Sequence, residues 1–465
     1  MEQTMIKNPL GYEKIPKLLK SFAIPSIIAM LVSSLYNIVD QIFIGQGVGY
    51  LGNAATNVSY PLTTICLAIA LLIGIGSASN FSLSLGGGDK EKAAKITGNA
   101  VCMMLMFGII YAVVIEIFLL PMLNAFGSTP DVLPYAQSYT RITAIGMPLL
   151  IVTNGISNLA RADGSPKYSM TCMLIGAVIN TILDPVFIFV FHQGVAGAAW
   201  ATVIGQFFSF LFALRYLRKF KSVELKREHF RLNLRLCLTT VTLGMSNSLN
   251  QVALTVVQIV MNNSLTYYGA MSVYGKEIPL AACGIVMKTN AILLAVIIGI
   301  SQGSQPIVGF NYGAKQYQRV KDTYKLAIVC NLVVSAIGFI LFQFFPRQII
   351  SLFGTGDEAY FEFSVKFMRI FLFMVIANGV QLISSNFFSA IGKPLKGMIL
   401  SLTRQVFFLI PLILIIPLFM GIDGIMFAGP VADTMAFIAT VVLISFEMRL
   451  ISRMQAQQKA GSSTV

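Results

Sequence analysis

Four carboxylates interrupt otherwise apolar stretches of the chain, and they are the side chains there most able to do chemistry. They are Asp40, Glu116, Asp184 and Asp433. An ionisable group in hydrocarbon costs at least about 2.5 kcal/mol on insertion scales, so each carboxylate needs a specific reason to be there. Glu116 falls near the end of its stretch, where it can reach interfacial water. Asp433 follows Gly429-Pro430, which predicts a break in the helix one turn earlier.

Asp40 and Asp184 are expected to lie at one depth. Asp40 falls about five residues, and Asp184 about seven, from the outer end of its segment, so both lie roughly 8–10 Å below the outer surface. Asn180 precedes Asp184 by one helical turn and shares its face. Thr202 falls at a similar depth in the next segment. Two carboxylates in one apolar site can share a proton. With amide and hydroxyl oxygens beside them, the group would also suit Na⁺.

The same four residues also allow a purely structural interpretation, in which their hydrogen bonds only hold helices together. Other polar residues of the apolar segments are candidates for contacting a substrate in a cleft. They are Tyr36, Asn37, Asn154, Gln206, Gln251, Gln258, Lys288, Asn378 and Asp433. We expect Lys288 to face the cleft or to pair with a polar group of the second half. Pro25, fifteen residues before Asp40, predicts a bend in the first segment.

The elements that must position these residues are transmembrane helices. Of the 465 residues, 56% are hydrophobic and only 11% are charged, against roughly 25% charged residues in a soluble domain. This composition excludes a soluble enzyme, a disordered protein and a disulfide scaffold. A spanning helix needs about 20 mainly apolar residues, and twelve segments qualify. They are 21–45, 57–84, 97–120, 136–160, 168–191, 196–217, 237–265, 279–309, 323–345, 360–390, 397–419 and 424–446.

The net charge of +14 is explained by topology. With the N-terminus inside, the inner tails and loops collect 27 of the 33 lysines and arginines, Arg161 and Arg404 among them. Five fall outside and Lys288 lies within a span. This asymmetry predicts twelve helices in the cell inner (plasma) membrane, with both termini cytoplasmic. No nucleic-acid partner is therefore needed to explain the basic composition.

Three motifs recur in the same order in the two halves of the chain. Ile73-Gly74-Ile75 matches Ile298-Gly299-Ile300 at an offset of 225 residues, Asn158 matches Asn386 at 228, and Gly194 matches Gly421 at 227. Six helices per half is an even number, so the repeats insert in parallel and predict a pseudo-twofold axis along the membrane normal. We therefore expect an all-α membrane protein of two six-helix bundles around a central cleft. The N-lobe would span 1–222, a cytoplasmic linker 223–236 and the C-lobe 237–465.

Several motifs together carry a family resemblance. They are Ile24-Pro25, Asn37-Ile38-Val39-Asp40-Gln41, Arg161-Ala162-Asp163-Gly164-Ser165-Pro166, Asn180-Thr181-Ile182-Leu183-Asp184-Pro185, Gly194-Val195-Ala196-Gly197, Gln302-Gly303-Ser304-Gln305-Pro306, Asn311-Tyr312-Gly313-Ala314 and Gly392-Lys393-Pro394. With these motifs the chain resembles the multidrug and toxic compound extrusion (MATE) family over residues 15–450. The similarity is to the branch whose ion-coupling acids lie in the N-terminal lobe.

The resemblance implies an antiporter that exports amphipathic or cationic compounds in exchange for H⁺ or Na⁺. It implies that Asp40, Asn180, Asp184 and Thr202 carry the coupling, and that helix 1 bends at Pro25 when the acid is protonated. Helices 7 and 10 carry amides and no carboxylate, so a second ion site in the C-lobe is in doubt. We expect a monomer in membrane lipid, without enzymatic activity or an organic cofactor.

Two other functions remain open from the sequence. A flippase for a lipid-linked substrate shares the two-lobe architecture, but it would typically have a cluster of arginines facing the cleft. A membrane-embedded transferase would need an intramembrane histidine or an acidic metal-binding cluster in an inner loop. Neither feature is evident, since the chain has only two histidines and both fall in predicted loops.

Overall fold

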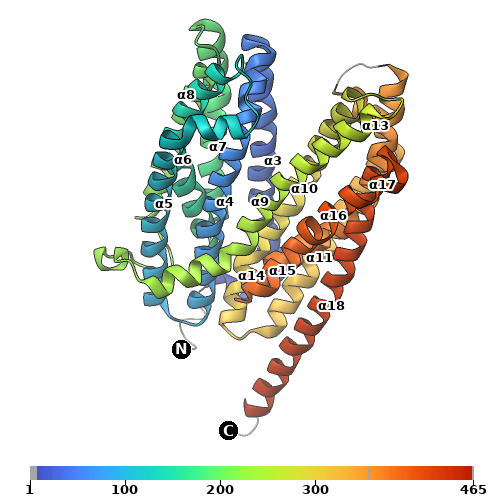
Figure 1. The fold of residues 1–465 in the computed structure, drawn as a ribbon. Helices are drawn as coiled ribbons and strands as arrows, with labels where there is room; N and C mark the ends of the chain where they lie inside the picture. Colours follow the sequence, from blue (N-terminus) through green and yellow to red (C-terminus); the bar gives the residue numbers. More distant parts are fainter. Residues whose placement is uncertain (1–7, 354–356, 463–465) are drawn as a thin grey trace.

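The computed structural model describes residues 8–353 and 357–462, and every regular element within them is helical. The first half of the chain forms one bundle, the N-lobe (Figure 1). Its elements are α2 (Pro9–Tyr12), α3 (Ile15–Val48), α4 (Tyr50–Gly86), α5 (Lys90–Ala125), α6 (Leu133–Ala162), α7 (Pro166–Pro185), the π-helical turn η1 (Val186–Val190) and α8 (Gly194–Tyr216). The six long helices correspond to the first six predicted segments; α3 to α6 extend beyond both predicted ends, and the fifth segment is completed by η1.

The second half forms the C-lobe. After the linker turn η2 (Arg227–Phe230), its elements are α9 (Leu234–Ala270), α10 (Glu277–Gly313), α11 (Tyr317–Phe344), α12 (Pro346–Ser351), α13 (Glu358–Phe371), α14 (Val375–Ala390), α15 (Pro394–Leu402), the π-helical η3 (Thr403–Leu409), α16 (Ile410–Ile415), α17 (Pro417–Met420) and α18 (Ile422–Ser462). The tenth predicted segment is broken into α13 and α14, which meet at 48°. The eleventh is divided among α15, η3, α16 and α17.

Ten helices of the described chain are long and apolar enough to cross a membrane, and the bent pair α13–α14 makes eleven. The remaining predicted span, the seventh along the chain, is α9, which is 37 residues long. It falls short in apolarity because Asn247, Asn250, Gln251 and Gln258 lie along it. The predicted all-α membrane architecture of two helix bundles is thus confirmed, and one of its spans is unusually polar.

Both described chain ends lie at one end of the molecule, which we call the terminal face (Figure 1). The first two long helices of each lobe pack against those of the other lobe in a reciprocal way: α3 packs on α10, and α4 packs on α9. From these contacts the two bundles diverge toward the opposite face (Figure 1). This reciprocity is the structural form of the sequence repeat, because α3 and α4 occupy in their half the places that α9 and α10 occupy in theirs.

Glycines allow the lobes to approach closely. A methyl group on Gly76 of α4 would meet the Thr240 carbonyl oxygen at 2.0 Å, and one on Gly244 of α9 would meet the Leu72 carbonyl oxygen at 1.7 Å. Gly299 of α10 also packs closely on the backbone of α3, since a methyl group there would lie 2.6 Å from the Cα of Ile27. Small residues at helix crossings let backbones pack in van der Waals contact where no hydrophobic driving force operates in lipid. The contact between the lobes therefore depends on residues without side chains.

Buried polar groups also join the lobes near these glycines. Arg161, at the end of α6, donates from Nη1 to Oε1 of Gln302 on α10 at 2.8 Å, and Gln305 Nε2 donates to Ser79 Oγ at 3.0 Å. Arg161 is only 3% exposed and makes no ion pair with any residue that the structure describes. The prediction that Arg161 lies in a loop was therefore wrong: its guanidinium is buried, with Nη1 donating to Asn158 and Gln302 and Nη2 donating to Ser169.

The connection between α8 and α9 lies against the N-lobe. Asp163 accepts hydrogen bonds from the backbone N–H groups of Lys221 and Ser222, at 2.7 and 2.9 Å. Asn99 of α5 donates to the carbonyl oxygen of Arg231 at 3.0 Å and accepts from the N–H of Asn233 at 2.6 Å. These bonds tie the linker to Asp163, at the end of α6, and to α5, which precedes the linker by more than a hundred residues.

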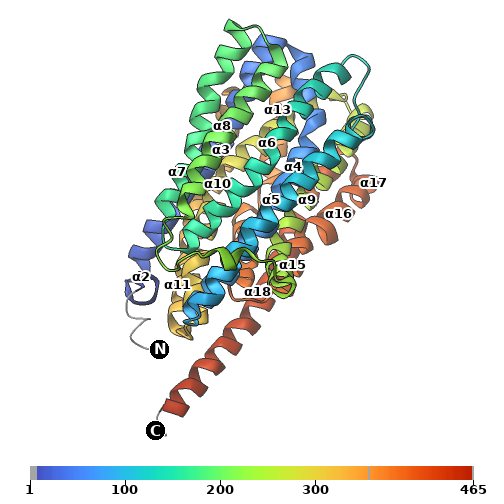
Figure 2. The same cartoon turned by 90° about the vertical axis from the view of Figure 1, so that its left-hand side faces the viewer.

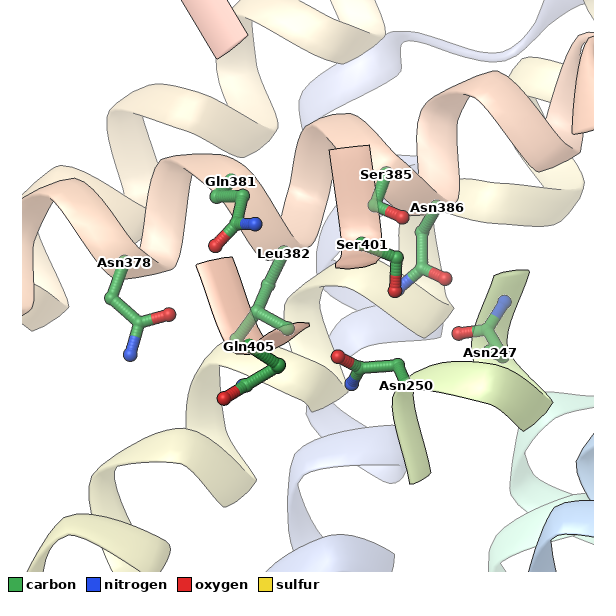
Figure 3. A pocket seen from close by; sticks show the side chains of 9 residues that line it. All are labelled: Asn247, Asn250, Asn378, Gln381, Leu382, Ser385, Asn386, Ser401 and Gln405. Carbon is green, nitrogen blue, oxygen red and sulfur yellow. The ribbon is translucent and has the colours of Figure 1, made fainter. Parts of the chain in front are cut away.

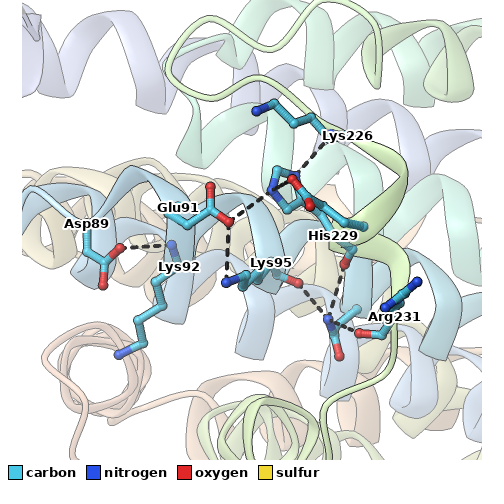
Figure 4. Close-up of polar contacts among 9 residues, drawn as sticks. Asp89, Glu91, Lys92, Lys95, Lys226, His229 and Arg231 are labelled. Atoms are coloured by element: carbon cyan, nitrogen blue, oxygen red, sulfur yellow. Dashed lines mark hydrogen bonds and ion pairs between the residues drawn. The ribbon is translucent and has the colours of Figure 1, made fainter.

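One residue of this linker, His229, is buried beside two acids (Figure 4). Ligand atoms of Glu91, Glu228 and His229 lie within 4.8 Å of one another, as a metal site would require. However, His229 Nδ1 accepts the N–H of Lys226 at 3.0 Å, so the neutral ring carries its hydrogen on Nε2. Nε2 lies 3.2 Å from Glu91 Oε1 and donates to it. The arrangement is thus a hydrogen-bonded clasp, and Nε2 has no lone pair free for a metal.

Candidate functional site

The structure brings together the four residues that the sequence spacing places at one depth. Asn180 Nδ2 donates to Asp184 Oδ1 at 3.1 Å and to Thr202 Oγ1 at 3.2 Å. Asp40, from α3, lies close enough to Asp184 for direct interaction of the two carboxyl groups. Asp184 is fully buried and Asp40 is partly exposed. We call Asp40, Asn180, Asp184 and Thr202 the acid cluster.

Close helix packing creates this geometry. A methyl group on Gly205 of α8 would meet the carbonyl oxygen of Gly176 on α7 at 2.7 Å, so the two backbones are nearly in contact. That approach sets Asn180 beside Thr202 one turn further along. On the other side, Gly47 of α3 packs directly on Ile188 of η1, which holds the end of α3 against the segment that follows Asp184.

The acid cluster contains more acceptors than donors. Oδ1 of Asp40, Oδ1 of Asn180 and Oδ2 of Asp184 are buried and have no hydrogen-bond partner among the described residues. No lysine or arginine of the described chain forms an ion pair with either acid. Buried acceptors are nearly always paired, because an unpaired one keeps its full desolvation cost. Three buried oxygens without a donor fit a proton or a small hard cation.

Two tyrosines border the acid cluster. Tyr36 of α3 and Tyr139 of α6 both lie within electrostatic range of Asp40 and Asp184. The sequence analysis singled out Tyr36 but missed Tyr139. The signal was available, because Tyr139 lies six residues after the start of α6 at Leu133, a depth similar to that used for Asp40. The cluster itself comes from three helices, α3, α7 and α8, and α6 borders it through Tyr139.

The C-lobe holds a second polar site, which we call the amide pocket (Figure 3). It is a cavity of about 20 Å³, enough for one water-sized group. Its lining comes from α9, α14, α15 and η3: Asn247, Asn250, Asn378, Gln381, Leu382, Ser385, Asn386, Ser401 and Gln405. Nδ2 of Asn247, Oδ1 of Asn386 and Oε1 of Gln405 are buried without a partner in the described chain. The pocket offers both donors and acceptors but no carboxylate.

Asp433 has a partner that the sequence did not reveal. Its Oδ1 accepts from Nε of Arg404 in η3, and both side chains are buried, at 4% and 8% exposed. The prediction that Arg404 lies in an inner loop was wrong, because η3 continues the eleventh span. The expected break at Gly429-Pro430 is absent as well, since α18 runs unbroken from Ile422 to Ser462 and Gly429 serves close packing on the ring of Phe371.

The remaining substrate candidates join neither the acid cluster nor the amide pocket in this conformation. They are Asn37, Asn154, Gln206, Gln251, Gln258 and Lys288. Asn154 is engaged with its own helix, donating to the carbonyl oxygen of Leu150 at 3.0 Å. Lys288 is exposed and has no ion pair within the described chain, and the position of Gly284 one turn earlier borders open space. Of the two expectations for Lys288, pairing with a polar group of the C-lobe is not met.

Pro25 lies inside α3, which continues without interruption from Ile15 to Val48. On either side of Pro25, α3 touches α10: a methyl group on Gly303 would lie 2.7 Å from the Cα of Ala23, and one on Gly299 would lie 2.6 Å from the Cα of Ile27. A proline removes one backbone hydrogen bond and so marks the weakest turn of the helix. That turn coincides with the contact between the lobes.

Two related six-helix lobes, joined near one face and carrying a buried acid cluster in one lobe, define a multi-pass membrane transporter. The MatE family model matches residues 25–186 and 248–415, which together make up more than half of the chain. The chain therefore belongs to the MatE family of membrane transporters.

Known members resemble it over nearly the full length. The multidrug export protein MepA of Staphylococcus haemolyticus is 26% identical, over 93% of this chain and 94% of that protein. MepA of Staphylococcus aureus strain N315 is 24% identical over the same shares of the two chains. A solved structure described as the outward-facing conformation of a multidrug resistance MATE family transporter superposes with a TM-score of 0.88, at 21% identity, covering 97% of this chain and 98% of that one.

Proposed function

We propose that the protein is a secondary antiporter that exports amphipathic, cationic organic compounds in exchange for H⁺ or Na⁺ bound at Asp40 and Asp184. Its similarity to the MepA multidrug export proteins over 93% of the chain supports the export of drug-like compounds. The acid cluster supports coupling to a cation. The observation that carries the proposal is the set of three unpaired, buried oxygens on Asp40, Asn180 and Asp184.

The chemistry of the acid cluster suits reversible ion binding. Two carboxylates without a basic partner cannot both be buried as anions at low cost, so the site gains stability when a proton or Na⁺ neutralises it. Asn180 and Thr202 keep the acceptors oriented, because the amide group spans both neighbours. Tyr36 and Tyr139 border the site. Loading and release of one cation therefore change the local charge of the cluster.

The transport cycle links this charge change to the lobes through α3. An ion enters from the opposite face and neutralises Asp40. The neutralised side chain then interacts less strongly with its polar partners. The helix then rearranges at Pro25, its weakest turn, and this turn touches Gly299 and Gly303 of α10. Substrate leaves toward the opposite face as α3 moves. The loaded carrier then opens at the terminal face, releases the ion and binds new substrate.

The orientation follows from the basic residues. Lys14 directly precedes α3, Lys17 and Lys20 lie on its first turns, and the linker between α8 and α9 carries a further group of lysines and arginines at the same face. Because short cytoplasmic segments are enriched in lysine and arginine, the terminal face is the cytoplasmic side of the plasma membrane in this proposal. A flippase gains no support, since the two arginines buried within the described helical spans, Arg161 and Arg404, bind protein groups.

Proteoliposomes containing the purified protein test this function. A gradient of H⁺ or of Na⁺ is imposed, and transport of a fluorescent organic cation is followed. One of the two gradients should drive transport of the fluorescent cation by the wild type. Asp40→Asn and Asp184→Asn should lose this dependence on the ion gradient. Glu116→Gln is the matched control, because Glu116 is a carboxylate in a span that only pairs at 3.4 Å with exposed Arg141. Wild-type rates in both aspartate variants would overturn the assignment.

A further inference from the structure

A groove separates the first turn of α3 from α11 at the terminal face. Its volume is about 500 Å³, and it is lined by Lys14, Ile15, Pro16, Asp322, Lys325, Leu326 and Val329. The segment α2–α3 belongs to the N-lobe and α11 to the C-lobe, so the groove lies on the seam between the lobes. Figure 2 shows α2 and α11 beside each other at this end of the molecule.

The two walls of the groove are fixed to each other. Arg319, from the first turn of α11, donates from Nη2 to the carbonyl oxygens of Leu10 and Glu13, at 3.0 and 2.7 Å. Its Nε donates to Oδ1 of buried Asn311 at 2.9 Å, which holds the guanidinium in place. Glu13 directly precedes Lys14, so the backbone that carries Lys14 has a defined position relative to α11. The groove is therefore part of the folded structure, with walls that do not depend on loose loops.

The positive charges at the rim of the groove are not used within the protein. Lys14 and Lys325 are exposed and have neither an ion pair nor a side-chain hydrogen bond among the described residues. The acid at the rim, Asp322, accepts a hydrogen bond from Gln318 Nε2 at 2.9 Å. Nearby Glu13 is paired with Lys17 at 2.6 Å. Two cationic groups thus remain available to an anionic ligand.

Below this rim the surface is apolar. Val329 of the groove is 47% exposed, and the same face of α11 continues with Val333 and Ile337, at 56% and 55% exposed. On α3, Ile24 and Ile28 are 44% and 39% exposed. Exposed apolar residues in line with a spanning helix face the acyl chains of the membrane. A charged rim above an apolar floor has the polarity of a single phospholipid molecule.

We propose that this α3–α11 groove binds one anionic phospholipid of the leaflet at the terminal face, with the phosphate between Lys14 and Lys325. The acyl chains lie along Leu326, Val329 and the apolar stripe that follows. The proposal rests on the orientation given above, in which this leaflet is the cytoplasmic one and carries anionic lipid. Because the lipid touches both lobes, it stabilises the arrangement in which they are closed at the terminal face.

Lipid binding to the purified full-length protein tests the proposal directly. Native mass spectrometry in detergent can count retained lipids while phosphatidylglycerol or phosphatidylcholine is titrated. Each lysine near an anionic headgroup contributes about 1 kcal/mol, so Lys14→Gln with Lys325→Gln should weaken binding of the first phosphatidylglycerol about 30-fold. Phosphatidylcholine binding should not change. Replacing both lysines by arginine should preserve phosphatidylglycerol binding, since the charge is kept.

The matched control replaces Lys90 and Lys92 by glutamine. Both are exposed at the start of α5, on the same face of the molecule, and the double variant loses the same charge. If the control weakens phosphatidylglycerol binding as much as the groove variant does, or if the groove variant binds like the wild type, the proposal is overturned. Binding is measured without an ion gradient or drug, and Asp184→Asn should bind the lipid normally. A failure of the groove proposal is thus distinguishable from a failure of ion coupling.

Discussion

The glycine contact between α9 and α4 is expected to control which face of the transporter is open. A methyl group added by Gly244→Ala would lie 1.7 Å from the Leu72 carbonyl oxygen, whereas real contacts of this kind are essentially never shorter than 3.0 Å. The two backbones must therefore separate by more than an ångström. Overpacking of this size costs about 1–3 kcal/mol. Since the strain exists only while the lobes are closed at the terminal face, the population should shift about 5- to 150-fold toward opening there.

Electron–electron double resonance between spin labels can measure this shift. Labels at Lys92 on α5 and Gln318 on α11, both exposed at the terminal face, report the separation of the lobes. Gly244→Ala should move the distance distribution toward longer values and lower the transport rate. Gly284→Ala is the matched control, because a methyl group there meets nothing within 4 Å. If both variants give the wild-type distribution, the lobes do not move against each other at the glycine contact and the reasoning fails.

Three further predictions concern single groups. Thr202→Val keeps the shape of the side chain but removes the hydroxyl that accepts a hydrogen bond from Asn180. The apparent affinity for the coupling ion should therefore fall about 5-fold, corresponding to about 1 kcal/mol. Transport measured as a function of ion concentration checks this, and Thr202→Ser should have near-normal affinity. Arg404→Met leaves Asp433 buried without its partner and should destabilise the protein by about 3–5 kcal/mol, whereas adding Asp433→Leu should restore much of the lost stability, as thermal unfolding in detergent can show. Asn99→Ala removes two of the hydrogen bonds that anchor the α8–α9 linker, so limited trypsin digestion should cut that linker faster than in the wild type, and unchanged cleavage would contradict the anchoring role of Asn99.

The spans and the acid cluster were accessible from sequence because their signals are local. A run of apolar residues marks a spanning helix wherever it occurs, and few carboxylates interrupt these runs. The depth of Asp40 and Asp184 follows from counting residues to the end of each helix, so their proximity could be anticipated. Tyr139 could have been found by the same counting.

What the sequence analysis missed depends on contacts between distant segments. Arg161 was assigned to a loop because basic residues usually lie there, but its main partner, Gln302, is 141 residues away. Arg404 was misplaced for the same reason, since its burial depends on Asp433 in the following helix. Pro430 was also a poor guide to a helix break: α18 continues through it, whereas the 48° bend between α13 and α14 occurs at 372–374, where there is neither proline nor glycine. Packing between helices decides these features.

The central claim is that Asp40 and Asp184 hold the coupling cation, and ion binding by the purified protein tests it most directly. In weakly buffered detergent solution, addition of an organic cation substrate should release protons from the wild type, or should displace bound radioactive Na⁺ if sodium is the coupling ion. Asp40→Asn and Asp184→Asn should abolish that release, while Glu116→Gln should leave it unchanged. Undiminished release of the same ion from both aspartate variants would contradict the account.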